Sequence, residues 1–141
     1  MWNTTTQSLT RVQDLIYPLT WEPIPTAITG KTASLGGDSL GLDPSSGPLV
    51  LCVVSAAWSL ASDDARIIAA TKDLFARIDK ASIAAGLFDR FKYLNYAASW
   101  QDPISGYGPV NKARLRAVSR KYDPAGLFQE GVPGGFKLFN A

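Results

Sequence analysis

The clearest pattern in the chain is one apolar face at helical spacing between Asp63 and Ala85, which predicts a long amphipathic helix. Ser62 precedes it as the expected N-cap, and Gly86 follows as the expected C′ residue. Asp73 and Arg77 lie four positions apart on the opposite face and are predicted to form an ion pair. The apolar face consists of Ile67, Ile68, Thr71, Leu74, Phe75, Ile78 and Ala85.

Two further stretches show the same spacing over shorter lengths. Residues 4–17 carry Leu9, Val12, Leu15 and Ile16 and end before Pro18, which predicts an N-terminal helix. The other stretch begins near Asn111 and ends at Asp123–Pro124, and it is expected to turn Leu115 and Val118 inward.

Strand patterns occur twice. Residues 19–22 alternate apolar and polar side chains before Pro23 and Pro25, which predicts a short strand. Residues 49–58 form a continuous apolar run, typical of a central strand with neighbours on both edges, and Cys52 within it is expected to be a core residue. Residues 26–47 are rich in Gly and predict a long irregular loop. We therefore expect a single α+β domain over residues 1–141, with a partial antiparallel sheet backed by amphipathic helices.

Composition removes several kinds of chemistry. Hydrophobic residues make up 46% and charged residues 18% of the 141 positions, as in globular proteins, and no apolar run is long enough to span a membrane. With no signal-peptide pattern, a cytoplasmic location is expected. The chain has no His and one Cys, which excludes a Ser-His-Asp site and makes a metal site improbable.

The charge is unevenly distributed along the chain. Residues 61–141 hold twelve basic and eight acidic side chains, and much of the excess falls in residues 112–121. No stacking aromatics are interleaved with these cations, which favours a solvated helix face over a nucleic-acid interface. We expect neither nucleic acid nor a membrane as a partner.

Candidate chemistry concentrates in a loop that begins at Phe91. Tyr93, Asn95 and Tyr96 follow one another closely, and the chain then continues through Asp102-Pro103 and Tyr107-Gly108. Loops with many oriented polar groups often line a site. The alternative is that these tyrosines are half-buried aromatics with satisfied hydroxyls, and that Asp102 belongs to an Asx-type turn.

The segment Tyr93-Leu94-Asn95-Tyr96, followed by Arg114-Leu115 and Asp123-Pro124, resembles the closing part of the berberine-bridge-enzyme-like FAD-linked oxidoreductases, of the fungal type. The resemblance extends back to about Trp2. It implies that residues 1–90 are a substrate-domain portion and residues 91–141 the C-terminal berberine-bridge-like segment. It also implies a fold like the second half of a flavin-oxidoreductase substrate domain.

Roles for individual residues follow from this resemblance alone. Tyr93 and Asn95 are implied to lie beside the flavin, and Tyr96 to face the substrate as the catalytic base. Many plant-like members of the family continue the Asn-Tyr pair with Arg-Asp. Here residues 97–103 read Ala-Ala-Ser-Trp-Gln-Asp-Pro instead. Large aromatics often anchor interfaces, but four are also candidate walls of a substrate pocket: Trp21, Trp58, Trp100 and Tyr107.

The resembled enzymes carry a large FAD-binding domain, and these 141 residues do not contain one. We therefore expect FAD only together with a partner chain, an FAD-binding large subunit. Because the chain has too few strands for the expected sheet, we also expect it to associate, either with itself or with a subunit that carries the missing strands. The favoured function is the small subunit or C-terminal half of an FAD-dependent oxidoreductase acting on a small organic, secondary-metabolite-like substrate. Two alternatives stay open: a flavin-free isomerase, cyclase or decarboxylase that reuses the pocket, with Tyr96, Tyr107 or Asp102 as acid or base, and a non-enzymatic interaction module.

Overall fold

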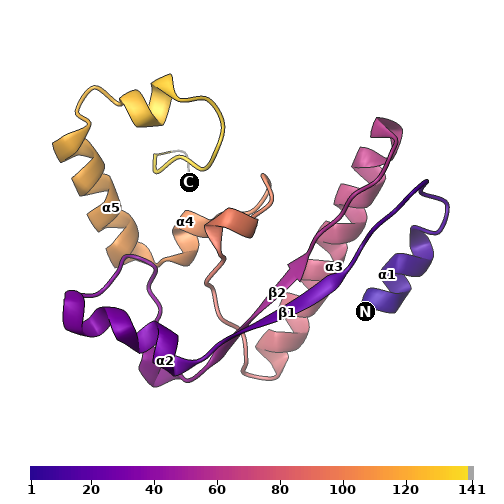
Figure 1. Cartoon of the computed structure of the whole chain (residues 1–141), viewed down its shortest axis with the longest axis horizontal. Helices are drawn as coiled ribbons and strands as arrows, with labels where there is room; N and C mark the ends of the chain where they lie inside the picture. Colours follow the sequence, from indigo (N-terminus) through magenta and orange to yellow (C-terminus); the bar gives the residue numbers. More distant parts are fainter. Residues whose placement is uncertain (140–141) are drawn as a thin grey trace. The chain divides into compact units, whose positions relative to one another are not determined.

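Two strands, β1 (Leu19–Ile24) and β2 (Leu49–Val54), pair side by side in an antiparallel ribbon that Ile16 and Ala57 prolong by a bridge (Figure 1). The computed structural model describes residues 1–139, with the backbone alone described for residues 33–35. The predicted α+β class is confirmed, since these strands are accompanied by several helices. No helix within the described residues is both long and apolar enough to cross a membrane.

The chain divides into two units by its internal contacts. Unit 1 comprises residues 1–22 and 50–89, and unit 2 comprises residues 23–49 and 90–141. The expectation of one domain with a boundary at residue 90 stays a prediction.

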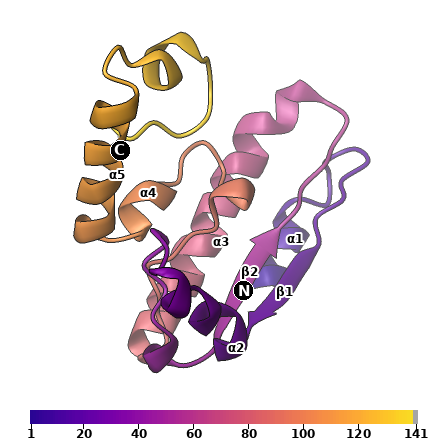
Figure 2. The same cartoon turned by 60° about the vertical axis from the view of Figure 1, so that its left-hand side comes forward.

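Unit 1 is built around the ribbon and two helices, α1 (Trp2–Ser8) and α3 (Asp64–Ala84). Both views show α3 running along the ribbon, with α1 nearby (Figures 1 and 2). The apolar side chains between the ribbon and these helices form one hydrophobic core, from which water is excluded. The fully buried core members are Leu9, Val12, Tyr17, Ile67 and Leu74.

The prediction of a helix over residues 4–17 was wrong in its length, because α1 ends at Ser8. Hydroxyl side chains in this segment bond backbone carbonyls: Thr6 donates to Asn3, Ser8 to Thr5 and Thr10 to Gln7. Such bonds compete with helix continuation. Of the four apolar residues at this spacing, Leu9 and Val12 are buried, whereas Ile16 is 62% exposed.

The ends of α3 agree with the prediction at one terminus only. Ser62 is not the N-cap, because it lies in a 3₁₀ turn (Ala61–Asp63) that leads into the helix at Asp64. At the other end of the helix Gly86 adopts φ +68°. The Gly86 N–H donates to the Ile83 carbonyl, and the Leu87 N–H donates to the Ser82 carbonyl. These two bonds are those of a Schellman motif, so the predicted C′ glycine is confirmed.

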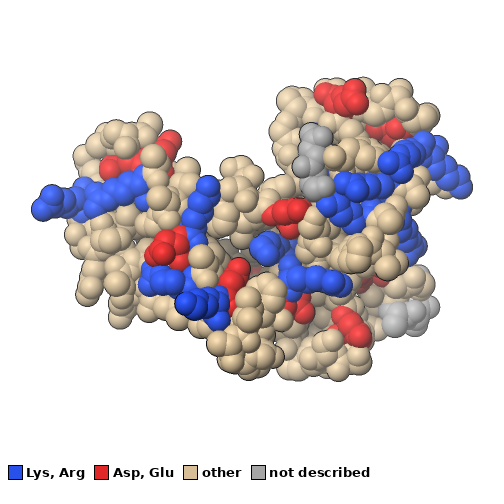
Figure 3. Space-filling view, turned by 180° about the vertical axis from the view of Figure 1, so that it is seen from behind, with Lys and Arg blue, Asp and Glu red and all other residues tan. Residues whose placement is uncertain are grey.

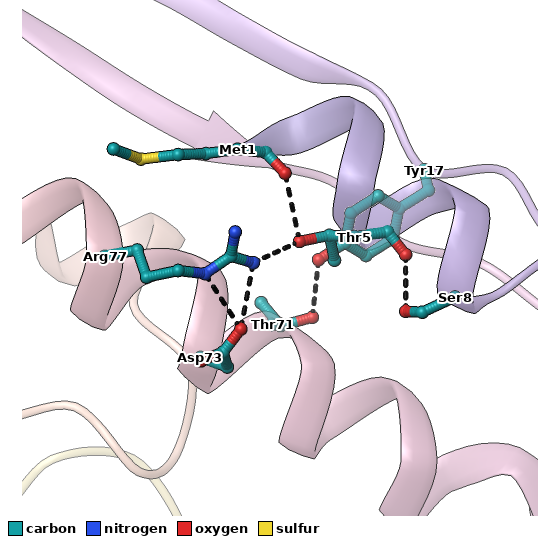
Figure 4. Close-up of polar contacts among 7 residues, drawn as sticks. All are labelled: Met1, Thr5, Ser8, Tyr17, Thr71, Asp73 and Arg77. Carbon is teal, nitrogen blue, oxygen red and sulfur yellow. Dashed lines mark hydrogen bonds and ion pairs between the residues drawn. The ribbon is translucent and has the colours of Figure 1, made fainter.

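Polar contacts tie α1 to α3 beside the core (Figure 4). Arg77 donates to Asp73 from Nε at 2.9 Å, which confirms the predicted pair, and its Nη2 reaches the Thr5 hydroxyl at 2.7 Å. The Tyr17 hydroxyl is 2.8 Å from that of Thr71. The Arg77–Thr5 bond therefore joins the two helices in addition to apolar packing, and the Tyr17–Thr71 bond joins the segment after α1 to α3.

The ribbon differs from the central sheet that was expected. β2 is a strand, as predicted, but within the described residues it pairs with β1 alone. β1 continues through Pro23 to Ile24, two residues beyond the predicted end. Proline is tolerated at position 23 because β1 is an edge strand, and a residue on an unpaired edge needs no N–H to donate to a neighbouring strand. Cys52 is half-buried and free rather than fully in the core.

Unit 2 consists of short helices and turns. Those before β2 are α2 (Thr26–Thr29), η1 (Gly30–Leu35) and η2 (Pro44–Ser46), in the region expected to be irregular. Those after residue 90 are η4 (Leu94–Tyr96), α4 (Pro103–Gly106), α5 (Pro109–Tyr122) and η5 (Leu127–Gly131). Its buried apolar side chains include Ile104 and Tyr107.

Helix α5 begins two residues before the predicted Asn111, with Pro109 in its first turn, where a missing N–H costs nothing. Leu115 is half-buried, but the prediction that Val118 turns inward was wrong, since Val118 is 46% exposed. No residue of α5 is fully buried. The helix therefore gains little from packing within unit 2.

Candidate functional site

Three of the predicted site residues lie together in unit 2 and form what we call the tyrosine–asparagine cluster: Tyr93, Asn95 and Tyr96. The 3₁₀ turn η4 brings the two rings to a centroid distance of 4.9 Å at 85°, an edge-to-face arrangement. The Asn95 Nδ2 donates to the Tyr93 hydroxyl at 2.9 Å. Tyr93 is 37% and Tyr96 52% exposed. The cluster is thus ordered internally while its outer surface is open.

Tyr107 differs from the cluster in being buried. Its ring stacks on Phe91 at a centroid distance of 6.1 Å. Burial raises the pKa of Tyr107, and the neighbouring Tyr93 raises it further. Its phenol is therefore neutral at physiological pH and suits packing or hydrogen-bond donation better than proton abstraction.

The predicted tryptophans are divided between the two units. Trp58 belongs to unit 1, where it packs against the core and its Nε1 donates to Asp64 at 2.7 Å. Trp100 is half-buried in unit 2, and Trp21 is 58% exposed on β1. Their roles as pocket walls stay predictions.

The structure contains a pocket that the sequence did not indicate. It has a volume of about 390 Å³ and lies wholly within unit 2. None of the predicted site residues lines it. Its lining residues are Thr29, Thr32, Gly37, Asp38, Gly41, Leu42, Asp43, Pro44, Arg90 and Asn111. The only signal for it in the sequence was the unusual length of the segment 26–47, which is typical of functional loops.

Hydrogen bonds to two carboxylates shape the loop side of this pocket. Asp38 accepts from the Thr32 hydroxyl at 3.0 Å and from the Leu40 N–H at 2.8 Å. Asp43 caps η2 by accepting from the Ser45 N–H at 2.8 Å. The side chain and backbone of Ser45 lower the pKa of Asp43, so this carboxyl is ionised at neutral pH.

Asp102 behaves as the turn residue that the sequence allowed. It is the N-cap of α4 and accepts from the Ser105 N–H at 2.9 Å. The Ser105 hydroxyl, then its N–H, and the nearby Lys112 and Lys92 lower the pKa of Asp102. A carboxyl with a lowered pKa is a poor general acid, which argues against Asp102 as a proton donor.

The next question is whether the described residues could support metal or thiol chemistry. Among the described residues, no three His, Cys, Asp or Glu side chains are grouped so that they could hold a metal ion. Burial, and secondarily the charge of Asp79, raises the pKa of Cys52. Since the thiolate is the reactive form, this environment disfavours Cys52 as a nucleophile.

Known proteins resemble most of this chain. It is 41% identical over 117 residues to an FAD-dependent monooxygenase of Fusarium proliferatum, and the match covers 83% of this chain but 23% of that protein. A bifunctional solanapyrone synthase of Alternaria solani is 40% identical over 83% of this chain and 22% of its own length. An oligopeptidase, PhomG′, of Diaporthe leptostromiformis is 34% identical over 97% of this chain and 11% of its own length.

The chain matches a small part of larger fungal FAD-linked enzymes. It spans less than a quarter of each of the three relatives described above. No protein-family model matches the chain. No solved structure matches it either.

Proposed function

We propose that this chain forms part of an FAD-linked oxidoreductase of the berberine-bridge-enzyme-like type that acts on a small organic, secondary-metabolite-like substrate. Its α+β fold would then be part of the substrate domain. The FAD-binding domain would come from residues outside these 141, in the same polypeptide or in a partner chain. Support comes from the similarity to several fungal FAD-dependent monooxygenases and from the geometry of the tyrosine–asparagine cluster.

The observation that carries the proposal is the exposed, internally ordered tyrosine–asparagine cluster. The exposed faces of these two rings would gain free energy if a bound group covered them. Asn95 keeps its carbonyl oxygen and one N–H for an outside group after bonding Tyr93. This donor and acceptor set fits the polar edge of a flat heterocycle such as an isoalloxazine.

Tyr96 is the proposed base within this arrangement. Bound FAD would supply the hydride-accepting capacity, which no side chain of this protein has. The Tyr96 side chain, as the phenolate, would take a proton from the substrate hydroxyl as the carbon that bears this hydroxyl loses a hydride, and general-base assistance of this kind contributes about 10²- to 10⁴-fold in rate. Edge contact with Tyr93 holds the Tyr96 ring in position.

The test is a chimera in which this chain replaces the matching segment of the Fusarium relative. We expect the purified chimera to retain the flavin absorbance and the turnover of that enzyme. Tyr96→Phe should lower turnover about 100-fold or more with flavin retained, whereas Asn95→Ala should lower flavin occupancy. Tyr122→Phe is the matched control, because Tyr122 is 73% exposed at the end of α5, and it should change neither property.

A folded chimera that is colourless, or one in which Tyr96→Phe and Tyr122→Phe behave alike, would contradict the proposal. Circular dichroism distinguishes this outcome from simple misfolding. For an unfolded chimera, the chain is added in trans to the relative truncated before the matching segment. If the folded chain does not restore flavin binding to the truncated relative, this result also contradicts the proposal.

A further inference from the structure

The pocket of unit 2 is lined by one cation, Arg90, which is exposed to solvent. Within residues 1–139 the Arg90 guanidinium makes no hydrogen bond or ion pair, although it lines the pocket. An arginine has five N–H donors in a fixed planar fork that matches a carboxylate. Arg90 is therefore available to an external acceptor.

Arg90 lies against two glycines of the turn before α5. A Cβ at Gly108 would lie 2.6 Å from Nη2 of Arg90, so the guanidinium rests against bare backbone. A Cβ at Gly106 would lie 2.7 Å from the Arg90 carbonyl oxygen. The contact at Gly106 is between backbones and requires glycine, so it sets the position of the Arg90 backbone, whereas the guanidinium at Gly108 is the end of a flexible side chain.

The opposite wall is held in place in a similar way. A Cβ at Gly41 would lie 2.4 Å from the Tyr107 carbonyl oxygen, which shows how closely the loop approaches the turn before α5. Asn111 donates to the same carbonyl from Nδ2 at 3.1 Å, which leaves its Oδ1 as an acceptor. The pocket is thus formed by backbone packing and hydrogen bonds before any ligand arrives.

The balance of charges selects the ligand. The lining combines one guanidinium with the carboxylates of Asp38 and Asp43, a net charge of −1, so a multiply charged anion such as phosphate is disfavoured. The carboxylates and the Asn111 oxygen offer acceptors, whereas Arg90 offers donors. A volume of about 390 Å³ suits a small molecule.

From this geometry we propose that the pocket binds a small carboxylic acid that also carries hydroxyl or ammonium donors. The ligand carboxylate pairs with Arg90, and its donors face Asp38, Asp43 and Asn111. The site is separate from the tyrosine–asparagine cluster, none of whose members lines it. The proposal therefore stands whether or not the chain works with FAD.

The test is a titration of the full chain, followed by ¹H–¹⁵N NMR, with four matched small molecules and with inorganic phosphate. Glycerate and serine carry both a carboxylate and donors, propionate has no such donors, and glycerol has no carboxylate. Glycerate or serine should shift the Gly37, Gly41 and Arg90 signals with a dissociation constant of roughly a millimolar, as expected for so few atoms. Whichever of the two binds more tightly shows whether the site prefers hydroxyl or ammonium donors. Propionate, glycerol and inorganic phosphate should bind at least about tenfold more weakly.

Arg90→Gln should weaken the binding of glycerate or serine about tenfold or more. The variant should remain folded, because Arg90 has no bonded partner in the described chain to leave unsatisfied. Arg114→Gln is the control, since Arg114 is an exposed arginine of α5 that does not line the pocket, and it should not change the affinity. The proposal is overturned if propionate binds as tightly as glycerate and serine, if Arg90→Gln has no effect, or if Arg114→Gln weakens binding equally.

Discussion

At the scale of single residues, Arg77 and Arg66 of α3 both donate hydrogen bonds to α1, Arg77 to the Thr5 hydroxyl and Arg66 to the Ser8 carbonyl. The bond of Arg77 to Asp73 is an exposed pair on one helix, with the Asp73 side chain 65% exposed, and such pairs contribute little. Its bond to Thr5 is different, because Thr5 is only 3% exposed and lies on the other helix. The tertiary bond should therefore matter more than the ion pair.

Arg77→Met keeps the aliphatic stem and removes both bonds. We expect it to lower the free energy of unfolding by about 1–2 kcal/mol, measured by urea denaturation. Asp73→Asn removes only the charge of the exposed partner and should cost less than about 0.5 kcal/mol. Equal losses in the two variants would show that the contact with Thr5 is not stabilising.

Tyr17 gives a second prediction at this scale, which concerns pH. Burial raises the pKa of Tyr17 above its ordinary value of 10.0, although the bond to Thr71 partly offsets the rise. The folded state then holds the phenol proton more tightly than the unfolded state does. This stabilisation is complete below pH 10 and is lost as the pH rises through the folded-state pKa.

Urea midpoints measured between about pH 8 and pH 11 should therefore fall at the alkaline end, and Tyr17→Phe should reduce the fall. The substitution should also cost about 1 kcal/mol at neutral pH through the lost bond to Thr71. Tyr107 has a pKa raised in the same direction and accounts for a separate part of the fall. A Tyr17→Phe profile with an unchanged alkaline slope would contradict the assignment.

At the scale of elements, the end of α3 depends on the left-handed conformation of Gly86. A Cβ there would meet nothing within 4 Å, so any effect of substitution comes from the backbone alone. Gly86→Ala should destabilise by about 1 kcal/mol. Gly30→Ala is the control, since Gly30 has φ −77° and an added Cβ would make only an ordinary contact with Pro44. It should be neutral or slightly stabilising in the same thermal melts; equal losses in both would refute the backbone explanation.

The two longer helices should also differ in their local stability. Helix α3 fully buries Ile67 and Leu74, whereas α5 buries no residue, and a free helix of about 14 residues is marginal in water. We expect amides in the middle of α5 to exchange with D₂O at least about 100-fold faster than those near Leu74. Comparable protection would mean that something covers α5 in solution.

Elements with repeated apolar spacing could be predicted from the sequence, as α3 and β2 show. The prediction failed where local hydrogen bonds decide the length of a helix. Around the end of α1, hydroxyl side chains of residues 6, 8 and 10 donate to backbone carbonyls, and the helix ends at Ser8. The same contrast holds for the candidate sites. The tyrosine–asparagine cluster is contiguous in sequence and was found. The pocket was missed because it joins Asp38, Arg90 and Asn111, which are distant along the chain.

At the scale of the whole molecule, the described surface carries many apolar and cationic side chains. Ile16, Trp21 and Val50 are each 58% exposed or more, on or next to the β ribbon. Figure 3 shows Lys and Arg side chains gathered over α5, and Arg116 and Arg120 lie over the Phe139 ring at 5.9 and 5.1 Å. These cations pack on the chain's own tail. The exposed apolar side chains of the ribbon have no such cover among the described residues, which makes the ribbon the stronger candidate for a contact between chains.

A two-stranded ribbon with open edges is marginal by itself and is prone to pair with another strand. We therefore expect the chain to self-associate through the ribbon. In sedimentation velocity at tens of micromolar it should have a mass above the 15.2 kDa of one chain. Val50→Lys places a charge on β2 and should return the protein to the monomer. Val110→Lys is the control, because Val110 is 79% exposed on α5, and it should leave the association unchanged. A folded 15.2 kDa monomer at every concentration would contradict self-association, because the exposed ribbon would then be stable without a second strand pair.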